Sequence, residues 1–397
     1  MRNSAQGDGE AFARFEAQVL ADAGLQQALA EPRVDAEFVA TAAETARGLG
    51  IDLSAAAVEE RIARDPLGLW RLAASPPLSD APPPGDWLPT AVAAEPDAGL
   101  RVEYCHFAGA PLDEPFYGVS ILRAQARPFN RAFRIATPLA PAGGGRRPDG
   151  LVFHQSRCGS TVLARMLGAL PGATAFSEPA PVDAVVHLAA TGRLGEDEAV
   201  AALRAILGAL GRRAEAEGGP FFVKLDAWHS LSLPLFRAAF PDTPWLFLFR
   251  EPVEILVSQM KARGQQTVPQ VMDPGYFGLE REDGAPAEDY CARVLARIGD
   301  AALRHAALGG GLFVDYADFA DAVVERIMPH FALAVDAASR RAIAAAALRD
   351  AKSPDRAFAA DAEGKRAVAG EAVREAANAY MRPVYEALKT AAAGVPA

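Results

Sequence analysis

From residue 149 onward, short apolar runs alternate with helical patterns, and few folds accommodate this alternation. The apolar runs lie at 151–154, 173–177, 221–225, 245–249 and 311–316. Residues with helical periodicity lie between them, at 160–170, 196–216, 231–239, 252–263 and 286–308. Strands that alternate with helices form a parallel sheet with helices on both faces. We therefore expect residues 149–397 to form a three-layer α/β domain with a central parallel sheet and a helical C-terminal part.

Residues 1–148 have a different pattern. Apolar residues three and four positions apart predict a helical domain at 1–75, which the proline-rich stretch ASPPLSDAPPPGDW ends. Residues 76–148 contain partly alternating segments such as RVEYCHF and RAFRIATPL, and we expect a linker and a small β-containing region there. A second break, APAGGGRRPDG, precedes the α/β domain.

The composition of the chain restricts the classes of partner and the cellular location that we expect for it. The 397-residue chain has a formal net charge of -10, so we expect no nucleic acid among its partners. Three widely spaced cysteines, Cys105, Cys158 and Cys291, predict neither a disulfide framework nor a zinc cluster. The sequence contains no signal-peptide pattern and no apolar run of about 18 residues. We expect a cytoplasmic protein with no metal and no transmembrane segment.

The stretch HQSRCGSTVL joins the apolar run at 151–154 to a helical pattern. In parallel sheets, ligands bind at the turns beyond the carboxyl ends of the strands. Backbone N–H groups at a helix start favour an anion, and Gly159 permits a close approach. Arg157 adds a guanidinium, and Ser160 and Thr161 add hydroxyl donors. The alternative is structural: Ser160 caps the helix and Gly159 turns the chain.

An ATP-binding loop, G-x-x-x-x-G-K-[ST], would place a lysine directly after the last glycine. In this sequence Ser160 follows Gly159. A kinase also needs an acidic magnesium ligand, whereas the apolar run at 245–249 is followed by Arg250. An ATP-dependent kinase with a degenerate P-loop is therefore one alternative, and a non-catalytic nucleotide-binding or interaction protein is another.

A second candidate anion site follows the run WLFLF, in REPVEILVSQM. Pro252 suits the first turn of a helix, where its missing N–H has no partner to lose. Arg250 then stands at the strand end, and Ser258, about two helical turns along, can point at the same ligand. The alternative is an ion pair between Arg250 and Glu251, Glu254 or another carboxylate.

Together the two motifs resemble those of the sulfotransferases that use 3′-phosphoadenosine 5′-phosphosulfate (PAPS). The resemblance covers roughly residues 150–330 and implies a P-loop-like fold. It also implies transfer of a sulfonate from PAPS to a hydroxyl or amine, which leaves 3′,5′-bisphosphoadenosine. By this resemblance the first motif clasps the 5′-phosphosulfate and the second clasps the 3′-phosphate. The cofactor-binding residues are then Arg157, Cys158, Gly159, Ser160, Thr161, Arg250 and Ser258. Many soluble members of the family have lysine in place of Arg157.

Sulfonate transfer needs a base for the acceptor proton and positive charge for the transferring group, which Arg157 can supply. Three candidate bases follow strand ends: Glu178, Asp226 and His229. Some peptide- and glycan-sulfating members carry a glutamate in a place comparable to Glu178, so the resemblance favours Glu178 first, Asp226 second and His229 third. The alternatives are structural: a carboxylate at a helix start for Glu178, and a buried ring beside Trp228 for His229.

Two further resemblances concern the ends of the chain. The N-terminal helical pattern loosely resembles nitrogen-fixation-type leader peptide domains, which implies a peptide or protein partner. A helical extension that packs on the rest of the protein is the alternative. Family members often close the 3′-phosphate pocket with late basic residues, and Lys352, Arg356, Lys365 and Arg366 are candidates beside the alternative of a solvated loop. The acceptor class stays open: a small molecule, glycan, lipid or peptide.

Overall fold

The computed structural model describes residues 2–63, 76, 78–95, 99–139, 145–280, 284–348 and 362–394. The chain divides into two compact units, Met1–Ala140 and Pro141–Ala397. Parts of both predicted breaks, at 74–75, 77 and 140–144, lie outside the described residues. The three-part division at 1–75, 76–148 and 149–397 stays a prediction.

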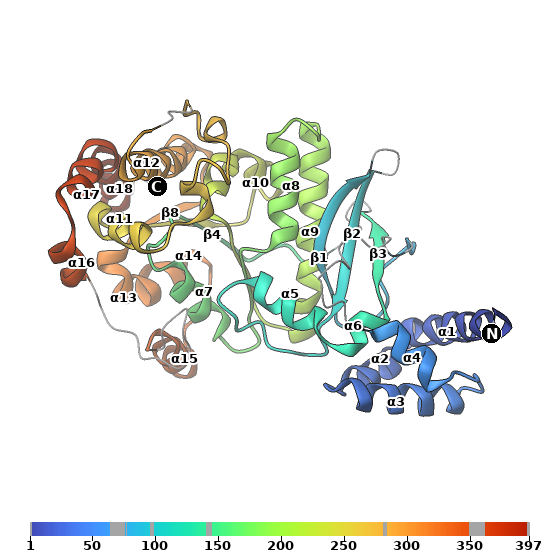
Figure 1. The fold of residues 1–397 in the computed structure, drawn as a ribbon. Helices are drawn as coiled ribbons and strands as arrows, with labels where there is room; N and C mark the ends of the chain where they lie inside the picture. The colour runs from blue at the N-terminus through green and yellow to red at the C-terminus, as the bar shows by residue number, and fades with distance from the viewer. Residues whose placement is uncertain are drawn as a thin grey trace. The chain divides into compact units, whose positions relative to one another are not determined.

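The first unit begins with helices, as the sequence predicted. These are α1 (Arg2–Ala21), α2 (Ala23–Ala30), α3 (Asp35–Gly48) and α4 (Ala55–Ile62) (Figure 1). Asp22 caps α2 by accepting from the N–H groups of Gly24 and Leu25. Phe12 and Phe38 pack their rings against Phe133, and the aromatic cluster forms part of the core of this unit.

A small antiparallel sheet completes the first unit. Its order is β1-β2-β3, with β1 at Trp87–Glu95, β2 at Gly99–His106 and β3 at Ile135–Pro138. Helices α5 (Tyr117–Gln125) and α6 (Pro128–Ala132) lie between β2 and β3 in the chain. The indole N–H of Trp87 donates to Oε1 of Gln26 at 2.9 Å, and Arg131 bonds to Asp35 and to the carbonyl of Ile62. The helices and the small sheet are thus tied together.

The second unit is built on the predicted parallel sheet. Its strands are β4 (Gly150–His154), β5 (Thr174–Ser177), β6 (Phe221–Lys224), β7 (Trp245–Phe249) and β8 (Gly311–Asp315), in the order β5-β6-β4-β7-β8. All neighbouring pairs are parallel. The carboxyl ends of the strands therefore meet at one edge, and the turns after β4, β5, β6 and β7 are neighbours there.

Side chains alternate between the two faces of this sheet. On one face Val152, Leu246 and Leu248 pack in a core with α7 (Ser160–Gly168), α11 (Pro252–Lys261) and α12 (Ala287–Arg304). On the other face Phe153 contacts Phe236 of α10 (Leu233–Ala239) edge to face. Burial on both faces explains why the strands read as continuous apolar runs.

The remaining helices of the second unit surround this sheet. They are α8 (Ala180–Ala190), α9 (Glu196–Glu217), α13 (Phe319–Ala322), α14 (Met328–His330), α15 (Ala337–Ala347), α16 (Ala362–Val368), α17 (Glu371–Ala376) and α18 (Arg382–Ala393). Figure 1 shows α8 and α9 side by side. Among the helices of the described segments, none has the length and apolar character that crossing a bilayer requires.

Candidate active site

The turn between β4 and α7 has an unusual backbone. Ser156 has a φ of 68° and Arg157 a φ of 51°, and Gly159 follows with a φ of 96°. Positive φ is uncommon in residues other than glycine, and such strain clusters at functional sites. Helix α7 begins directly after Gly159, and no side chain of the described residues caps it. Ser160 therefore does not cap the helix, and the helix start has the arrangement that favours an anion.

Neighbouring polar groups hold the start of this turn. The N–H of Ser156 donates to Nδ1 of His154 at 3.0 Å, while Nε2 of His154 lies 2.9 Å from the carbonyl oxygen of Leu225. These contacts select the neutral imidazole with its proton on Nε2, in agreement with burial, which lowers the pKa of His154. The hydroxyl of Ser156 accepts from Nε2 of Gln259 at 3.0 Å. The turn is thus anchored to α11 and to the end of β6.

The predicted binding residues of this turn differ in where their side chains go. Arg157 is half-buried and donates from Nη2 to the carbonyl of Ala262, just beyond α11. Cys158 is buried, its thiol donates to the carbonyl of Leu248 at 3.2 Å, and burial raises its pKa to about 11. Cys158 can therefore meet a ligand through its main chain only. Thr161 is half-buried in the first turn of α7.

Gly159 and Arg250 contact the same tyrosine ring. A Cβ at Gly159 would lie 2.3 Å from Cε2 of Tyr316, so the ring packs directly on the glycine. Cζ of Arg250 lies 4.2 Å from the centroid of that ring, a cation–π distance. Tyr316 follows β8 and Arg250 follows the neighbouring β7. The ring therefore joins the two motifs, a role that the sequence did not reveal.

Arg250 is buried and also forms the ion pair that the sequence offered as an alternative. Its Nε donates to Oε2 of Glu254 at 2.6 Å. The other oxygen of Glu254, Oε1, lies 3.4 Å from Nη1 of Arg366 in α16. Ser258 donates its hydroxyl to the carbonyl of Glu254 at 2.9 Å, a bond within its own helix. Of the other late basic residues, Lys365 also lies in α16, and Lys352 and Arg356 lie outside the described residues.

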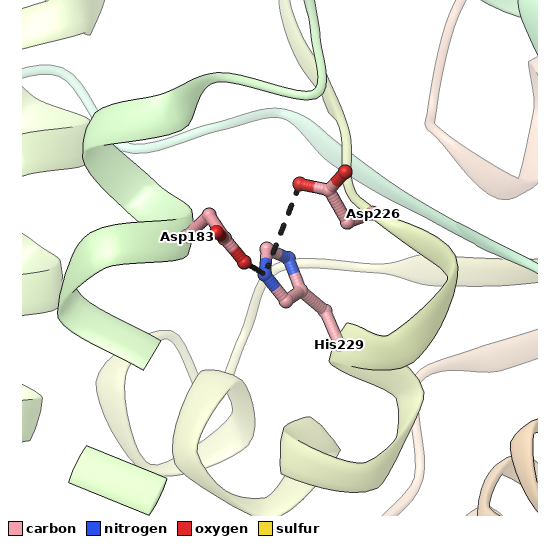
Figure 2. Close-up of side chains that lie close together, drawn as sticks. All are labelled: Asp183, Asp226 and His229. Carbon is pink, nitrogen blue, oxygen red and sulfur yellow. Dashed lines mark hydrogen bonds and ion pairs between the residues drawn. The ribbon is translucent and has the colours of Figure 1, made fainter. Parts of the chain in front are cut away.

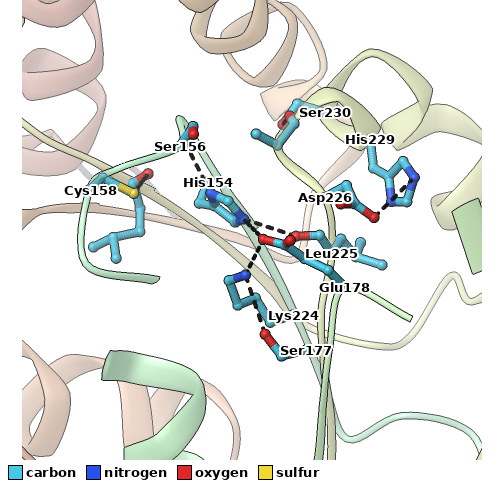
Figure 3. Close-up of polar contacts among 12 residues, drawn as sticks. His154, Ser156, Cys158, Ser177, Glu178, Lys224, Leu225, Asp226, His229 and Ser230 are labelled. Carbon is cyan, nitrogen blue, oxygen red and sulfur yellow. Dashed lines mark hydrogen bonds and ion pairs between the residues drawn. The ribbon is translucent and has the colours of Figure 1, made fainter. Parts of the chain in front are cut away.

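Glu178 stands at the end of β5 in an ion pair. It has a φ of 51°, and Nζ of Lys224, the last residue of β6, donates to its Oε1 (Figure 3). The same Nζ donates to Oγ of Ser177 at 3.3 Å, and Nε2 of His154 lies 3.7 Å from Oε1 of Glu178. Burial alone would raise the pKa of Glu178, but the Lys224 ammonium and the His154 ring lower it to about 2. Glu178 is therefore ionised, and its carboxylate is bound to the ammonium of Lys224.

Asp226, two residues after Lys224, lies in an environment that favours its protonated form, in contrast to Glu178. It is buried, and no hydrogen bond to its carboxyl group comes from any residue that the structure describes. Its Oδ2 lies 3.9 Å from Nε2 of His229. Burial is the main cause that raises the pKa of Asp226 to about 7; Glu178 and Asp183 act in the same direction, and His229 and Lys224 oppose them.

His229 is fully buried and contacts an aspartate from another helix. Its Nε2 lies 2.9 Å from Oδ1 of Asp183 in α8 (Figure 2). The indole N–H of Trp228 donates to the same oxygen at 2.8 Å. The ligand atoms of Asp183, Asp226 and His229 lie within 4.8 Å of one another, which is close enough for a metal ion. In the structure, Oδ1 of Asp183 instead forms the hydrogen bonds with His229 and Trp228 described above. Asp183 was not among the residues predicted for the site, although a lone acidic residue inside the apolar helix APVDAVVHLAA is a signal for it.

Neither a protein-family model nor a curated protein matches the sequence. Solved structures similar to the chain include the sulfotransferase domain from the curacin biosynthetic pathway, with 12% identity over 50% of this chain and 78% of that one (TM-score 0.35). Another is the sulfotransferase domain of the Synechococcus olefin synthase, with 15% identity over 61% and 98% (TM-score 0.36). A third is a sulfotransferase from Mycobacterium avium, with 14% identity over 64% and 78% (TM-score 0.38). Identities this low transfer no residue roles, so we base the function on the site itself.

Proposed function

We propose that the second unit is a PAPS-dependent sulfotransferase that transfers a sulfonate to a hydroxyl or amine of its acceptor. The contact of Gly159 and Arg250 with the one ring of Tyr316 carries this proposal. It brings a strained turn at a helix start and a buried guanidinium close together, from the ends of neighbouring strands. A nucleotide with an anionic group at each end needs two such groups near each other.

In this proposal, each of the two motifs binds one anionic group of the nucleotide. Arg157, Ser160, Thr161 and the main chain of Cys158 and Gly159 hold the 5′-phosphosulfate at the start of α7. Arg250 holds the 3′-phosphate with Ser258, and the Tyr316 ring fixes the plane of the guanidinium. PAPS supplies the sulfonate and leaves as 3′,5′-bisphosphoadenosine. The start of α7, which no side chain of the described residues caps, and the strained turn before it fit an anion, which supports this assignment.

Asp226 suits the role of base in this proposal better than Glu178, which the sequence resemblance favours. A general base works best with a pKa near the operating pH, and burial brings Asp226 there. Glu178 is held ionised by Lys224. Two neighbouring carboxyl groups with separated pKa values are the usual sign of divided acid-base roles. Lys224 and Arg157 then provide positive charge for the transferring sulfonate. His229 is hydrogen-bonded to Asp183 and helps to hold the turn after β6 that contains Asp226.

Calorimetric titration with 3′,5′-bisphosphoadenosine, adenosine 5′-phosphate and ATP plus magnesium tests the proposal. We expect the bisphosphate to bind most tightly, and Arg250→Ala to weaken it far more than the 5′-phosphate. A preference for ATP with magnesium would replace the proposal with the kinase alternative. Bisphosphate binding without sulfate transfer to phenols, sugars, lipids or peptides would favour the non-catalytic alternative.

A further inference from the structure

We propose that Asp183 is a positioning residue for the transfer reaction, because it binds the Nε2 hydrogen of His229 and so keeps that hydrogen off the carboxylate of Asp226. The inference rests on the proposed function, in which Asp226 takes the proton of the acceptor. It adds a residue of α8 to that step. Asp183 acts through His229 in this inference, and the acceptor meets only Asp226.

One ring nitrogen of His229 faces two carboxyl groups. Its Nε2 lies 2.9 Å from Oδ1 of Asp183 and 3.9 Å from Oδ2 of Asp226 (Figure 2). An N–H group donates a hydrogen bond at about 2.7–3.2 Å, so the first contact is a hydrogen bond and the second is not. Shortening the second distance by about 0.7 Å would make it one. His229 is thus within reach of both carboxyl groups, and its hydrogen lies on Asp183.

Two features keep the hydrogen of His229 on Asp183. Burial alone would raise the pKa of Asp183, but the hydrogen bonds from His229 and Trp228 lower it, so that Asp183 is an ionised acceptor at neutral pH. The ring of His229 also packs between neighbours, with its centroid 5.9 Å from that of Trp228 and 5.8 Å from that of Phe236. Charge and packing therefore both favour the contact with Asp183.

The other polar atoms of His229 show where its hydrogen would go without Asp183. Its Nδ1 is buried, and no described residue forms a hydrogen bond with that atom. Its backbone N–H donates to the carbonyl of Asp226 at 3.0 Å, which keeps the two residues together. A buried N–H group without an acceptor is costly. If Asp183 were removed, we therefore expect Nε2–H to turn to the carboxylate of Asp226.

A hydrogen bond from His229 would make Asp226 a weaker base. Burial is the main cause that raises the pKa of Asp226 to about 7, and a bond to its charged form would lower that pKa. Tyr276 does not add a charge near neutral pH, because burial raises its pKa from an ordinary 10. The titratable side chains around Asp226 in the described segments are Glu178, Asp183, Lys224, His229 and Tyr276.

The pH dependence of sulfonate transfer tests the inference, with an acceptor that the wild type sulfates. Asp183→Asn keeps an oxygen acceptor for His229 and removes only a charge, so the midpoint near pH 7 should fall slightly. Asp183→Ala also removes the acceptor, and its midpoint should lie about one pH unit lower still, with a slower plateau rate. Asp197→Asn, at an exposed aspartate of α9, is the control and should leave the profile unchanged.

A second substitution shows whether the effect passes through His229. Asp183→Ala/His229→Phe lacks the donor as well as its acceptor, so its midpoint should return to that of Asp183→Asn. A purely structural role of Asp183 would lower the rate at every pH and leave the midpoint in place. Asp183→Leu, which also lacks an acceptor and fills more space, replaces Asp183→Ala if that variant does not fold.

NMR of ¹⁵N-labelled histidine gives a readout that does not depend on activity. The chain has six histidines, and His229→Phe assigns the signal of interest. We expect the hydrogen-bonded Nε2 proton of His229 in the wild type and in Asp226→Asn alike. In Asp183→Ala this signal should shift with pH as Asp226 ionises, and by more than in the wild type.

Three results would overturn the inference. They are equal midpoints in the wild type and both Asp183 variants, a midpoint of Asp183→Ala that His229→Phe does not raise, and loss of the Nε2 proton signal in Asp226→Asn. If the wild type transfers sulfonate to no phenol, sugar, lipid or peptide, the proposed function fails and this inference fails with it. If the rate depends on Asp226 and its midpoint does not depend on Asp183, only this inference fails.

Discussion

Glu178 and Asp226 follow neighbouring strands of one sheet, yet only Glu178 has a cation bound to its carboxylate. The ammonium of Lys224 lies on Glu178, whereas the carboxyl group of Asp226 receives no hydrogen bond from the described residues. The pKa of Glu178 is consequently lowered to about 2, and the pKa of Asp226 is raised to about 7.

Asp226→Asn should remove the base without removing the nucleotide. We expect the release of 3′,5′-bisphosphoadenosine from PAPS, with a phenol as acceptor, to slow by about 10²–10⁴-fold while the affinity for the bisphosphate stays the same. In the wild type the rate should rise with pH through about 7, because Asp226 accepts a proton only when it is ionised. A rise of the same shape in the variant would assign the base elsewhere.

Glu178→Gln should destabilise the second unit. Lys224 is 1% exposed as a side chain, and the substitution removes the carboxylate that receives its ammonium. Breaking a buried ion pair from one side costs about 3 kcal/mol in the free energy of unfolding. Urea unfolding of Glu178→Gln and of Glu178→Gln/Lys224→Met measures this, since the second substitution removes the buried charge that faced the Glu178 carboxylate. The double variant should be the more stable of the two, and the reverse order would contradict the prediction.

Gly159→Ala should cost more stability than the same change at Gly192. Both glycines have positive φ, 96° and 68°, but the space beside Gly192 is open, whereas a Cβ at Gly159 would meet Tyr316 at 2.3 Å. We expect a loss of about 1 kcal/mol at Gly192 from the backbone alone, and a total loss of about 3 kcal/mol at Gly159 from backbone and clash together. Thermal unfolding compares them. In a Tyr316→Ala background, where the ring that causes the clash is absent, Gly159→Ala should cost only the backbone part, about 1 kcal/mol.

His106 should make the first unit sensitive to acid. Its ring is buried between Trp87 and Phe129, and burial lowers its pKa to about 4 from an ordinary 6.5. Because the unfolded chain takes up the proton first, the stability due to neutral His106 is full above pH 6.5 and is lost as the pH falls to about 4. The loss is about 3 kcal/mol. Urea unfolding at several pH values should show a weaker pH dependence in His106→Leu, and an unchanged slope would refute the assignment.

Local signals allowed the parallel sheet and several element bounds to be predicted. The run at 245–249 is β7, and Pro252 begins α11, because an apolar run and a proline at a helix start act within a few residues. The positions of Arg157 and Arg250 at strand ends were predictable for the same reason. Their separation in space was not.

The rest of the site depends on contacts that the chain makes over long distances. The order of strands places β5 beside β6, and only that neighbourhood brings Lys224 to Glu178. Tyr316 reaches Gly159 and Arg250 because β8 pairs with β7. Cys158 stands among the binding residues in sequence, yet its side chain is buried and its thiol donates to the carbonyl of Leu248. No periodicity or spacing encodes these contacts.

The bond between the Trp87 indole and the Gln26 amide has a practical consequence for dissecting the chain. A fragment that starts in the proline-rich stretch would expose the ring of Phe133 to water and leave the buried indole N–H without its acceptor. A cut at 140/141 keeps both sides of each of these contacts on the same fragment. Expression of the first 140 residues by themselves is therefore expected to give a folded product, and expression of the helices without the small sheet is expected to give aggregates.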